Sequence, residues 1–144
     1  MVNMMNIHNE KPVQMVSDGA VAEMETLLLV DDEKAILELC RLFLGDMGYI
    51  VLTANSPYDA IRLAQDYSGK INMLITDIIM PVMNGLELAE TLSSIRPDIK
   101  CVFISGYPPE TIFTARMYER GVNFIQKPFK LKDFADRIHN ILNN

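Results

Sequence analysis

The sequence is poor in positive charge. Lysine and arginine number 13 against 19 aspartate and glutamate residues, which gives a formal net charge of −6. Proteins that bind nucleic acid broadly need a basic surface to neutralise phosphates, so this composition argues against that class of function. The charge balance is compatible with protein partners and with a site that collects a cation.

Cysteine and histidine are also scarce, with two residues of each type. Cys40 and Cys101 lie in segments predicted to face a core, where we expect two free thiols in a reducing cytoplasm. A disulfide between them is the alternative. His8 and His139 have no partners at the spacing of metal ligands, so we expect both on the surface.

Long apolar runs are absent. No run approaches the ~20 apolar residues that span a bilayer, and the amino terminus lacks the basic start and apolar stretch of a secretion signal. We therefore predict a cytoplasmic protein with no membrane contact. Residues 1–24 are interpreted as a flexible leader or linker, with a short docking segment as the alternative, and residues 25–144 as one folded domain.

Five short runs rich in Val, Ile and Leu alternate with segments of helical periodicity. The runs cover residues 26–30, 49–54, 71–76, 99–104 and 122–126. They are nearly continuously apolar, as expected when helices cover both faces of a parallel sheet. The repeated β-α alternation predicts a doubly wound α/β sandwich, although the order of its strands does not follow from periodicity.

Apolar stripes and capping residues predict the helices between these runs. The expected stripe of the first helix is Ile36, Cys40, Phe43 and Met47. Ser56-Pro57 and Asn84-Gly85 mark the starts of the second and third helices. A fourth helix is expected from Pro108 to Gly121, and a fifth near the carboxyl terminus.

An acidic, hydroxyl or ammonium side chain directly follows four of the five runs. Asp31 and Asp32 follow the first run, Asp77 the third, Ser105 the fourth and Lys127 the fifth. The carboxyl ends of strands in an open parallel sheet lie along one edge, where such folds place their sites. Carboxylates are ligands that suit Mg²⁺, while a hydroxyl and an ammonium can contact phosphoryl oxygens. The grouping predicts a pocket for a divalent cation and a phosphoryl group.

Simpler explanations exist for single members of this set. Asp31-Asp32 could serve simply as a helix cap, and Ser105-Gly106 simply as a turn. Phe124 could be an ordinary core residue. A carboxylate in the position of Asp77 could ligate Mg²⁺, act as a base or attack phosphorus. The combination of residues favours the site over the separate structural explanations.

Four motifs together resemble the receiver domains of two-component response regulators. They are Leu29-Val30-Asp31-Asp32-Glu33, Asp77 with Met80-Pro81-Val82-Met83-Asn84-Gly85, Ser105-Gly106, and Lys127-Pro128-Phe129. The resemblance covers about residues 25–142. It implies a flavodoxin-like (βα)5 fold, with a five-stranded parallel sheet of order 2-1-3-4-5 between two helical layers. It also implies a signalling module that is no enzyme beyond its own phosphorylation and autodephosphorylation.

The resemblance further implies that Asp77 accepts a phosphoryl group from a sensor histidine kinase or a histidine phosphotransfer protein. The implied Mg²⁺ ligands are Asp31, Asp32, Asp77 and the backbone carbonyl of Ile79. Ser105 and Lys127 would contact the acyl phosphate. The domain could stand alone or belong to a hybrid sensor histidine kinase.

The switch implied by the resemblance involves Ser105, Tyr107 and Phe124, and the Lys127-Pro128 bond is often cis in such domains. A downstream effector protein would bind the face formed by the fourth helix, fifth strand and fifth helix. Neither Ile79 nor Tyr107 has a carboxamide or carboxylate that would orient an attacking water, so we expect slow loss of the phosphoryl group, with Tyr107 shielding the acyl phosphate.

Two other functions remain as alternatives. A haloacid-dehalogenase-like phosphatase also uses a strand-end aspartate, but it needs a second carboxylate two residues later, where this sequence has Ile79. A pseudo-receiver would bind partners without phosphorylation, and the intact set of Asp32, Asp77, Ser105 and Lys127 argues against it.

Overall fold

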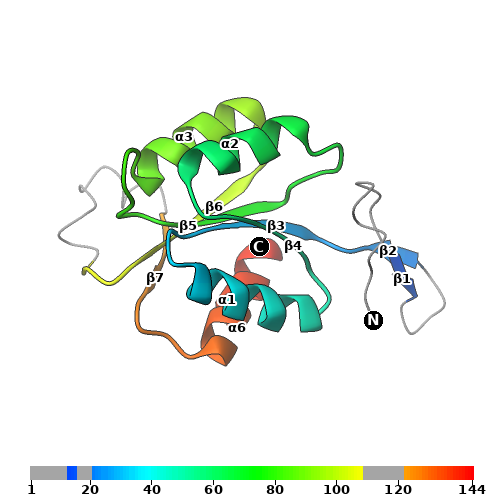
Figure 1. The fold of residues 1–144 in the computed structure, drawn as a ribbon. Helices are drawn as coiled ribbons and strands as arrows, with labels where there is room; N and C mark the ends of the chain where they lie inside the picture. Colours follow the sequence, from blue (N-terminus) through cyan, green and yellow to red (C-terminus); the bar gives the residue numbers. More distant parts are fainter. Residues whose placement is uncertain (1–12, 16–20, 109–121) are drawn as a thin grey trace.

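The computed structural model describes residues 13–15, 21–108 and 122–144 (Figure 1). Its central sheet has five parallel strands: β3 (Thr26–Val30), β4 (Ile50–Ala54), β5 (Met73–Asp77), β6 (Lys100–Ser105) and β7 (Asn123–Gln126). Their order is β4-β3-β5-β6-β7, which is the 2-1-3-4-5 order of a flavodoxin-like sheet. β3, the first of these five strands in sequence, therefore lies inside the sheet, between β4 and β5.

Helices cover both faces of this sheet (Figure 1). The helices are α1 (Lys34–Asp46), α2 (Pro57–Asp66), α3 (Gly85–Ile95) and α6 (Leu131–Leu142). One core cluster joins alternate strand residues to α1 and α6, and the other joins the intervening residues to α2 and α3. The central strands β3 and β5 are largely apolar because both of their faces are buried. The predicted fourth helix lies outside the described residues.

The predicted stripe of α1 is wrong in part. Its buried residues are Leu37, Cys40 and Leu44, whereas Met47 is 49% exposed and follows the helix. Apolar side chains of α1 point in most directions around its axis, so residue spacing alone is compatible with more than one buried face. Packing against the sheet selects the face, and sequence periodicity did not contain that information. Cys40 and Cys101 are free thiols, as predicted.

Capping side chains begin α2 and α3 at the predicted residues. The Ser56 hydroxyl accepts a hydrogen bond from the Asp59 backbone N–H at 3.2 Å, and Pro57 occupies the first turn. Asn84 and Glu87 form a reciprocal capping box, with hydrogen bonds of 2.9 and 3.1 Å. The second cap fixes the end of the loop that follows β5.

Two side chains tie helix ends to other parts of the domain. The Arg96 guanidinium donates to the backbone carbonyls of Ala64, Tyr67 and Gly69 around the end of α2. Lys100 donates from β6 to carbonyls of the last turn of α6 and beyond, at 2.8–3.1 Å. The bonds to Ala64 and Leu142 satisfy carbonyls in the last turns of α2 and α6, where a helix leaves its carbonyls unpaired.

Two further strands precede the central sheet. β1 (Val13–Met15) and β2 (Val21–Glu23) pair antiparallel as a separate two-stranded sheet, and β2 leads into β3. The role of residues 1–24 as a leader or linker stays a prediction. Among the described residues, no helix has the length and apolar character required to cross a membrane.

Candidate functional site

Three carboxylates meet at the carboxyl edge of the sheet. Each of Asp31, Asp32 and Asp77 offers an oxygen, and these oxygens lie within 4.8 Å of one another. The first two follow β3 and the third ends β5, which is the neighbouring strand in the sheet. Asp31 is 5% exposed and Asp77 8% exposed, so two of the three carboxylates are buried. This arrangement agrees with the strand-end grouping predicted from the sequence.

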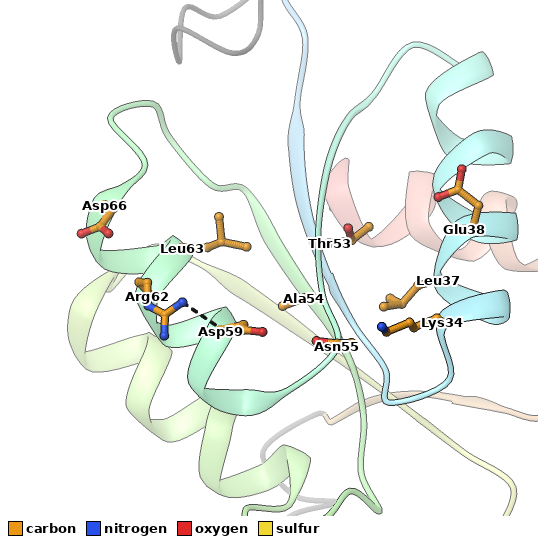
Figure 2. A pocket seen from close by; sticks show the side chains of 10 residues that line it. All are labelled: Lys34, Leu37, Glu38, Thr53, Ala54, Asn55, Asp59, Arg62, Leu63 and Asp66. Carbon is orange, nitrogen blue, oxygen red and sulfur yellow. Dashed lines mark hydrogen bonds and ion pairs between the residues drawn. The ribbon is translucent and has the colours of Figure 1, made fainter.

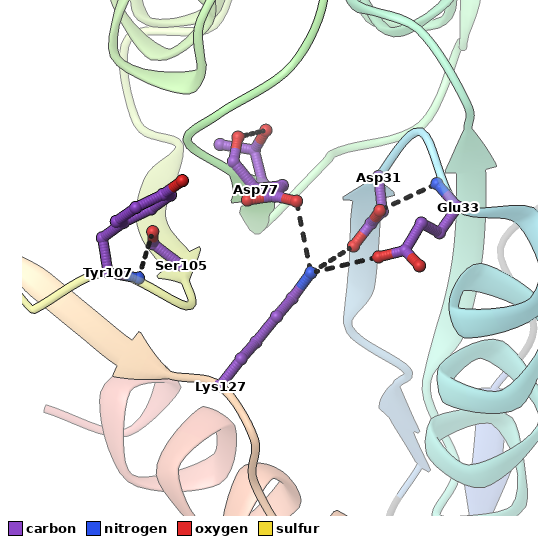
Figure 3. Close-up of polar contacts among 7 residues, drawn as sticks. Asp31, Glu33, Asp77, Ser105, Tyr107 and Lys127 are labelled. Carbon is purple, nitrogen blue, oxygen red and sulfur yellow. Dashed lines mark hydrogen bonds and ion pairs between the residues drawn. The ribbon is translucent and has the colours of Figure 1, made fainter.

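Lys127 lies among these carboxylates (Figure 3). Its Nζ is 3.1 Å from Asp31 Oδ2 and 3.2 Å from Asp77 Oδ2. Glu33 Oε1 is 3.8 Å away, and the Glu33 backbone N–H donates to Asp31 Oδ1 at 2.9 Å. The Lys127 N–H donates to the Ser105 carbonyl at 2.8 Å, and the peptide bond to Pro128 is cis. The two charge-assisted bonds of the Lys127 ammonium orient the carboxylates of Asp31 and Asp77 toward the same nitrogen.

Burial and charge act in opposite directions on these groups. Burial raises the pKa of Asp77 above its usual range, and the attraction of Lys127 reduces this shift without cancelling it. Burial alone would lower the pKa of Lys127, but its hydrogen bonds and attraction to Asp31 and Asp77 raise it. Lys127 is therefore a firmly charged ammonium, while the charge on Asp77 is costly in the absence of a further cation.

Ser105 ends β6, the strand next to β5. It is 1% exposed, and its Oγ accepts a hydrogen bond from the Tyr107 backbone N–H at 3.0 Å. Tyr107 is 58% exposed, and its ring stands beside Ser105 at the site (Figure 3). Phe124 is half-buried on β7, opposite Phe103 in the sheet register, and packs against the core on the α2 and α3 side.

The backbone contacts itself where the loop after Asp77 begins and ends, at Ile78 and Gly85. The Gly85 N–H donates to the Ile78 carbonyl at 2.8 Å, and a Cβ on Gly85 would lie 2.3 Å from the Asp77 carbonyl oxygen. Between these ends, Ile79 is 55% exposed, and Val82 is 80% exposed with a φ of 76°. A left-handed backbone is uncommon for a β-branched residue. The contact at Gly85 explains why the loop ends in glycine.

Sequence analysis assigned no role to two residues of this site. Glu33 contacts Lys127, and the Thr76 hydroxyl donates to the Asp77 carbonyl at 2.9 Å. Glu33 follows the acidic pair directly, which is a signal that could have identified it. The contact of Thr76 depends on the local turn of the backbone, for which the sequence contains no comparable signal.

A groove of about 560 Å³ lies between α1 and α2, beside the edge strand β4 (Figure 2). Its lining residues are Lys34, Leu37, Glu38, Thr53, Ala54, Asn55, Asp59, Arg62, Leu63 and Asp66. None of the clustered carboxylates is among them. The groove therefore does not include the acidic site, although its lining residue Ala54 accepts a hydrogen bond from the Asp31 N–H.

Comparison with known proteins agrees with this architecture. A family model described as the response regulator receiver domain matches residues 27–139. The sensor kinase CckA of Brucella abortus (strain 2308) is 32% identical over 133 residues, which are 92% of this chain and 14% of that kinase. The response regulator SaeR of Staphylococcus aureus (strain USA300) is 31% identical over 121 residues, which are 83% of this chain and 51% of SaeR. The chain thus spans about half or less of the length of these relatives.

Solved structures show the same relationship. A receiver domain from the hybrid histidine kinase CckA has a TM-score of 0.69 and 32% identity, over 81% of this chain and 98% of that domain. A response regulator receiver domain protein from Clostridium thermocellum has a TM-score of 0.73 and 27% identity, over 83% and 95% of the two chains. Fold and site together define a signalling domain of the two-component class. The chain belongs to the response regulator receiver domain family.

Proposed function

We propose that Asp77 accepts a phosphoryl group from the phosphohistidine of a sensor histidine kinase or a histidine phosphotransfer protein. The observation that carries this proposal is the contact of one ammonium, Lys127, with the buried carboxylates of Asp31 and Asp77 at the carboxyl edge of the sheet. Asp77 is the strand-end carboxylate that lies between the acidic pair on β3 and Ser105 on β6. It therefore has ionic and hydrogen-bonding groups on both sides.

The donor set fits Mg²⁺. Three carboxylate oxygens within 4.8 Å of one another are hard ligands, and two of the carboxylates are buried where their mutual repulsion is poorly screened. Asp31, Asp32, Asp77 and the backbone carbonyl of Ile79 would hold the ion. When bound, Mg²⁺ supplies positive charge to the phosphoryl oxygens and keeps the carboxylates ionised.

The reaction follows from the positions of the protein's own groups. A carboxylate oxygen of Asp77 forms the new P–O bond as the P–N bond of the phosphohistidine breaks, and the electron pair of that bond stays on the imidazole nitrogen. The Lys127 ammonium neutralises a phosphoryl oxygen. The Ser105 oxygen already accepts from the Tyr107 N–H, so its own hydrogen is available for donation to a second phosphoryl oxygen.

The proposal includes a switch and an output. Ser105, Tyr107 and Phe124 would repack on phosphorylation and change the face that α6 and β7 share with the predicted fourth helix. A downstream effector protein would bind that face. We assign the domain to the cytoplasm, with no contact to nucleic acid or membrane, because of its acidic charge and its two free thiols. Similarity to the CckA receiver supports a kinase partner.

The test is intact mass measurement after incubation with Mg²⁺ and acetyl phosphate. We expect one phosphoryl adduct in the wild type, none in Asp77→Asn, and an unchanged adduct in Asp98→Asn, which removes an exposed carboxylate outside the site. The adduct should persist for minutes rather than seconds, because neither Ile79 nor Tyr107 provides a carboxamide or carboxylate to orient water. An adduct that survives in Asp77→Asn would contradict the assignment of the phosphoacceptor. A wild type without an adduct would support the pseudo-receiver, and steady phosphate release from monoesters the phosphatase.

A further inference from the structure

A fully buried hydroxyl directly precedes the proposed phosphoacceptor. Thr76 lies in β5 with 0% exposure, and its Oγ1 donates to the backbone carbonyl of Asp77 at 2.9 Å. The acceptor thus belongs to the residue whose carboxylate is proposed to react. This acceptor is a main-chain oxygen and not one of the carboxylate oxygens proposed to react.

Burial alone does not account for this bond. Thr26 in β3 is also 0% exposed, yet within the described part of the chain its hydroxyl has no hydrogen-bond partner. The two threonines therefore occupy equally buried strand positions in one sheet, and only Thr76 bonds to the site. This difference provides an internal comparison.

The peptide that follows Asp77 is held from other directions as well. The Ile78 N–H donates to the Ile104 carbonyl of β6 at 3.0 Å, and its carbonyl accepts from the Gly85 N–H at 2.8 Å. Gly85 also lies against the Asp77 carbonyl oxygen, where even a Cβ would come within 2.3 Å. The Thr76 hydroxyl completes this set of contacts. Since the orientation of the backbone sets the direction of the Cβ, these contacts aim the Asp77 side chain.

We propose that Thr76 is a positioning residue, whose hydroxyl holds the Asp77 main chain so that the carboxylate stays directed at Lys127 and the other two aspartates. This inference rests on the proposed function of Asp77. Valine at position 76 keeps the shape of threonine but cannot donate, so the Asp77 carbonyl loses this bond. The peptide then samples more orientations, and the carboxylate spends less time in the reactive position.

The experiment compares Thr76→Val, Thr76→Ser and Thr26→Val with the wild type. Thr76→Val and Thr26→Val make the same chemical change at two equally buried positions, while Thr76→Ser loses a methyl group and keeps the hydroxyl. Three quantities are measured: the Mg²⁺ dissociation constant by NMR titration, the rate of phosphorylation by acetyl phosphate at saturating Mg²⁺, and the ¹³C shift of the Asp77 carbonyl without metal. Urea unfolding verifies that each variant is folded, and Thr76→Ala replaces Thr76→Val if the latter does not fold.

In Thr76→Val we expect weaker Mg²⁺ binding and slower phosphorylation, each by up to about tenfold, which corresponds to the loss of one hydrogen bond. The carbonyl shift should move in this variant, and Thr76→Ser and Thr26→Val should stay close to the wild type. Equal losses in Thr76→Val and Thr76→Ser would indicate packing and overturn the inference. So would wild-type values in Thr76→Val, or a matching loss in Thr26→Val. If the wild type takes up no phosphoryl group, the proposed function fails, while the metal affinities and the carbonyl shift still decide the role of Thr76.

Discussion

At the scale of single residues, the acidic cluster combines charges that attract and charges that repel. Lys127 forms ion pairs with Asp31 and Asp77, and both of these carboxylates are buried. For Asp77, the loss of hydration outweighs the attraction of the ammonium, so its pKa is raised. The ionised site is therefore held at a cost to stability unless a cation joins it.

This cost predicts how Asp77→Asn changes stability with pH. A carboxyl group whose pKa is higher in the folded state than in the unfolded state binds its proton more tightly when folded. The wild type therefore loses stability as the pH rises from about 4, the ordinary range of aspartate, through the raised pKa. Asparagine does not titrate. We expect the free energy of unfolding of the metal-free variant to exceed that of the wild type at pH 7 by more than it does at pH 3.

Urea denaturation at both pH values, in the presence of a chelator, measures this difference. Asp98→Asn serves as the control for the removal of an exposed charge. A gap between Asp77→Asn and the wild type that stays constant, or that shrinks toward neutral pH, would refute the prediction.

At the scale of elements, sequence signals predicted the local structure well where a single residue type has a distinct physical role. Asn84 and Glu87 form the capping box that starts α3, and the strand ends place Asp77 and Lys127 together. The face of α1 was misassigned, because Leu37 and Leu44 compete with Ile36 and Phe43 on a helix that is apolar around most of its surface. Only contact with the sheet decides between those faces.

The parts of the site that could not be predicted depend on three-dimensional detail. The bond from Thr76 to the Asp77 carbonyl joins neighbours in sequence, yet it requires a particular backbone orientation that spacing does not encode. The three bonds of Arg96 reach back 27 to 32 residues to the end of α2. Nothing in the sequence around Arg96 indicates that its side chain donates hydrogen bonds to the carboxyl end of α2.

Arg96 gives a prediction at this scale. Replacement by methionine keeps an apolar stem but removes the donors to Ala64, Tyr67 and Gly69, so several half-buried carbonyls lose their partners. We expect Arg96→Met to lower the free energy of unfolding by about 2 kcal/mol. Arg62→Met is the control, since the Arg62 side chain is 70% exposed and pairs with Asp59 on the same helix, and it should cost about 0.5 kcal/mol or less. Similar losses in the two variants, measured by urea unfolding, would exclude the proposed role of Arg96.

At the scale of the whole molecule, the sheet order determines which distant segments share the site. β3 lies between β4 and β5, so the acidic pair from the start of the domain meets Asp77 from its middle. Lys127, from a loop near the carboxyl end, reaches the same point. A ligand at this edge therefore contacts segments that separate when the domain unfolds.

Mg²⁺ should accordingly stabilise the entire fold. A ligand that binds only the folded state at 100 times its dissociation constant adds about 2.7 kcal/mol to the free energy of unfolding. We expect thermal unfolding of the wild type to move to higher temperature with increasing MgCl₂, and that of Asp77→Asn to move much less. NaCl at matched ionic strength is the control. If it produces the same shift, or if both proteins respond equally to Mg²⁺, the effect comes from general screening and the proposed ligand set is wrong.

The contact between Gly85 and Asp77 also restricts how the domain can change shape. No methyl group fits between the first residue of α3 and the end of β5, so this helix has no space to advance toward the sheet. Ile79 and Val82 already extend into solvent from the intervening loop. The end of β5 thus blocks a closer approach of α3, so a displacement of this loop toward the sheet at Gly85 meets the backbone of Asp77.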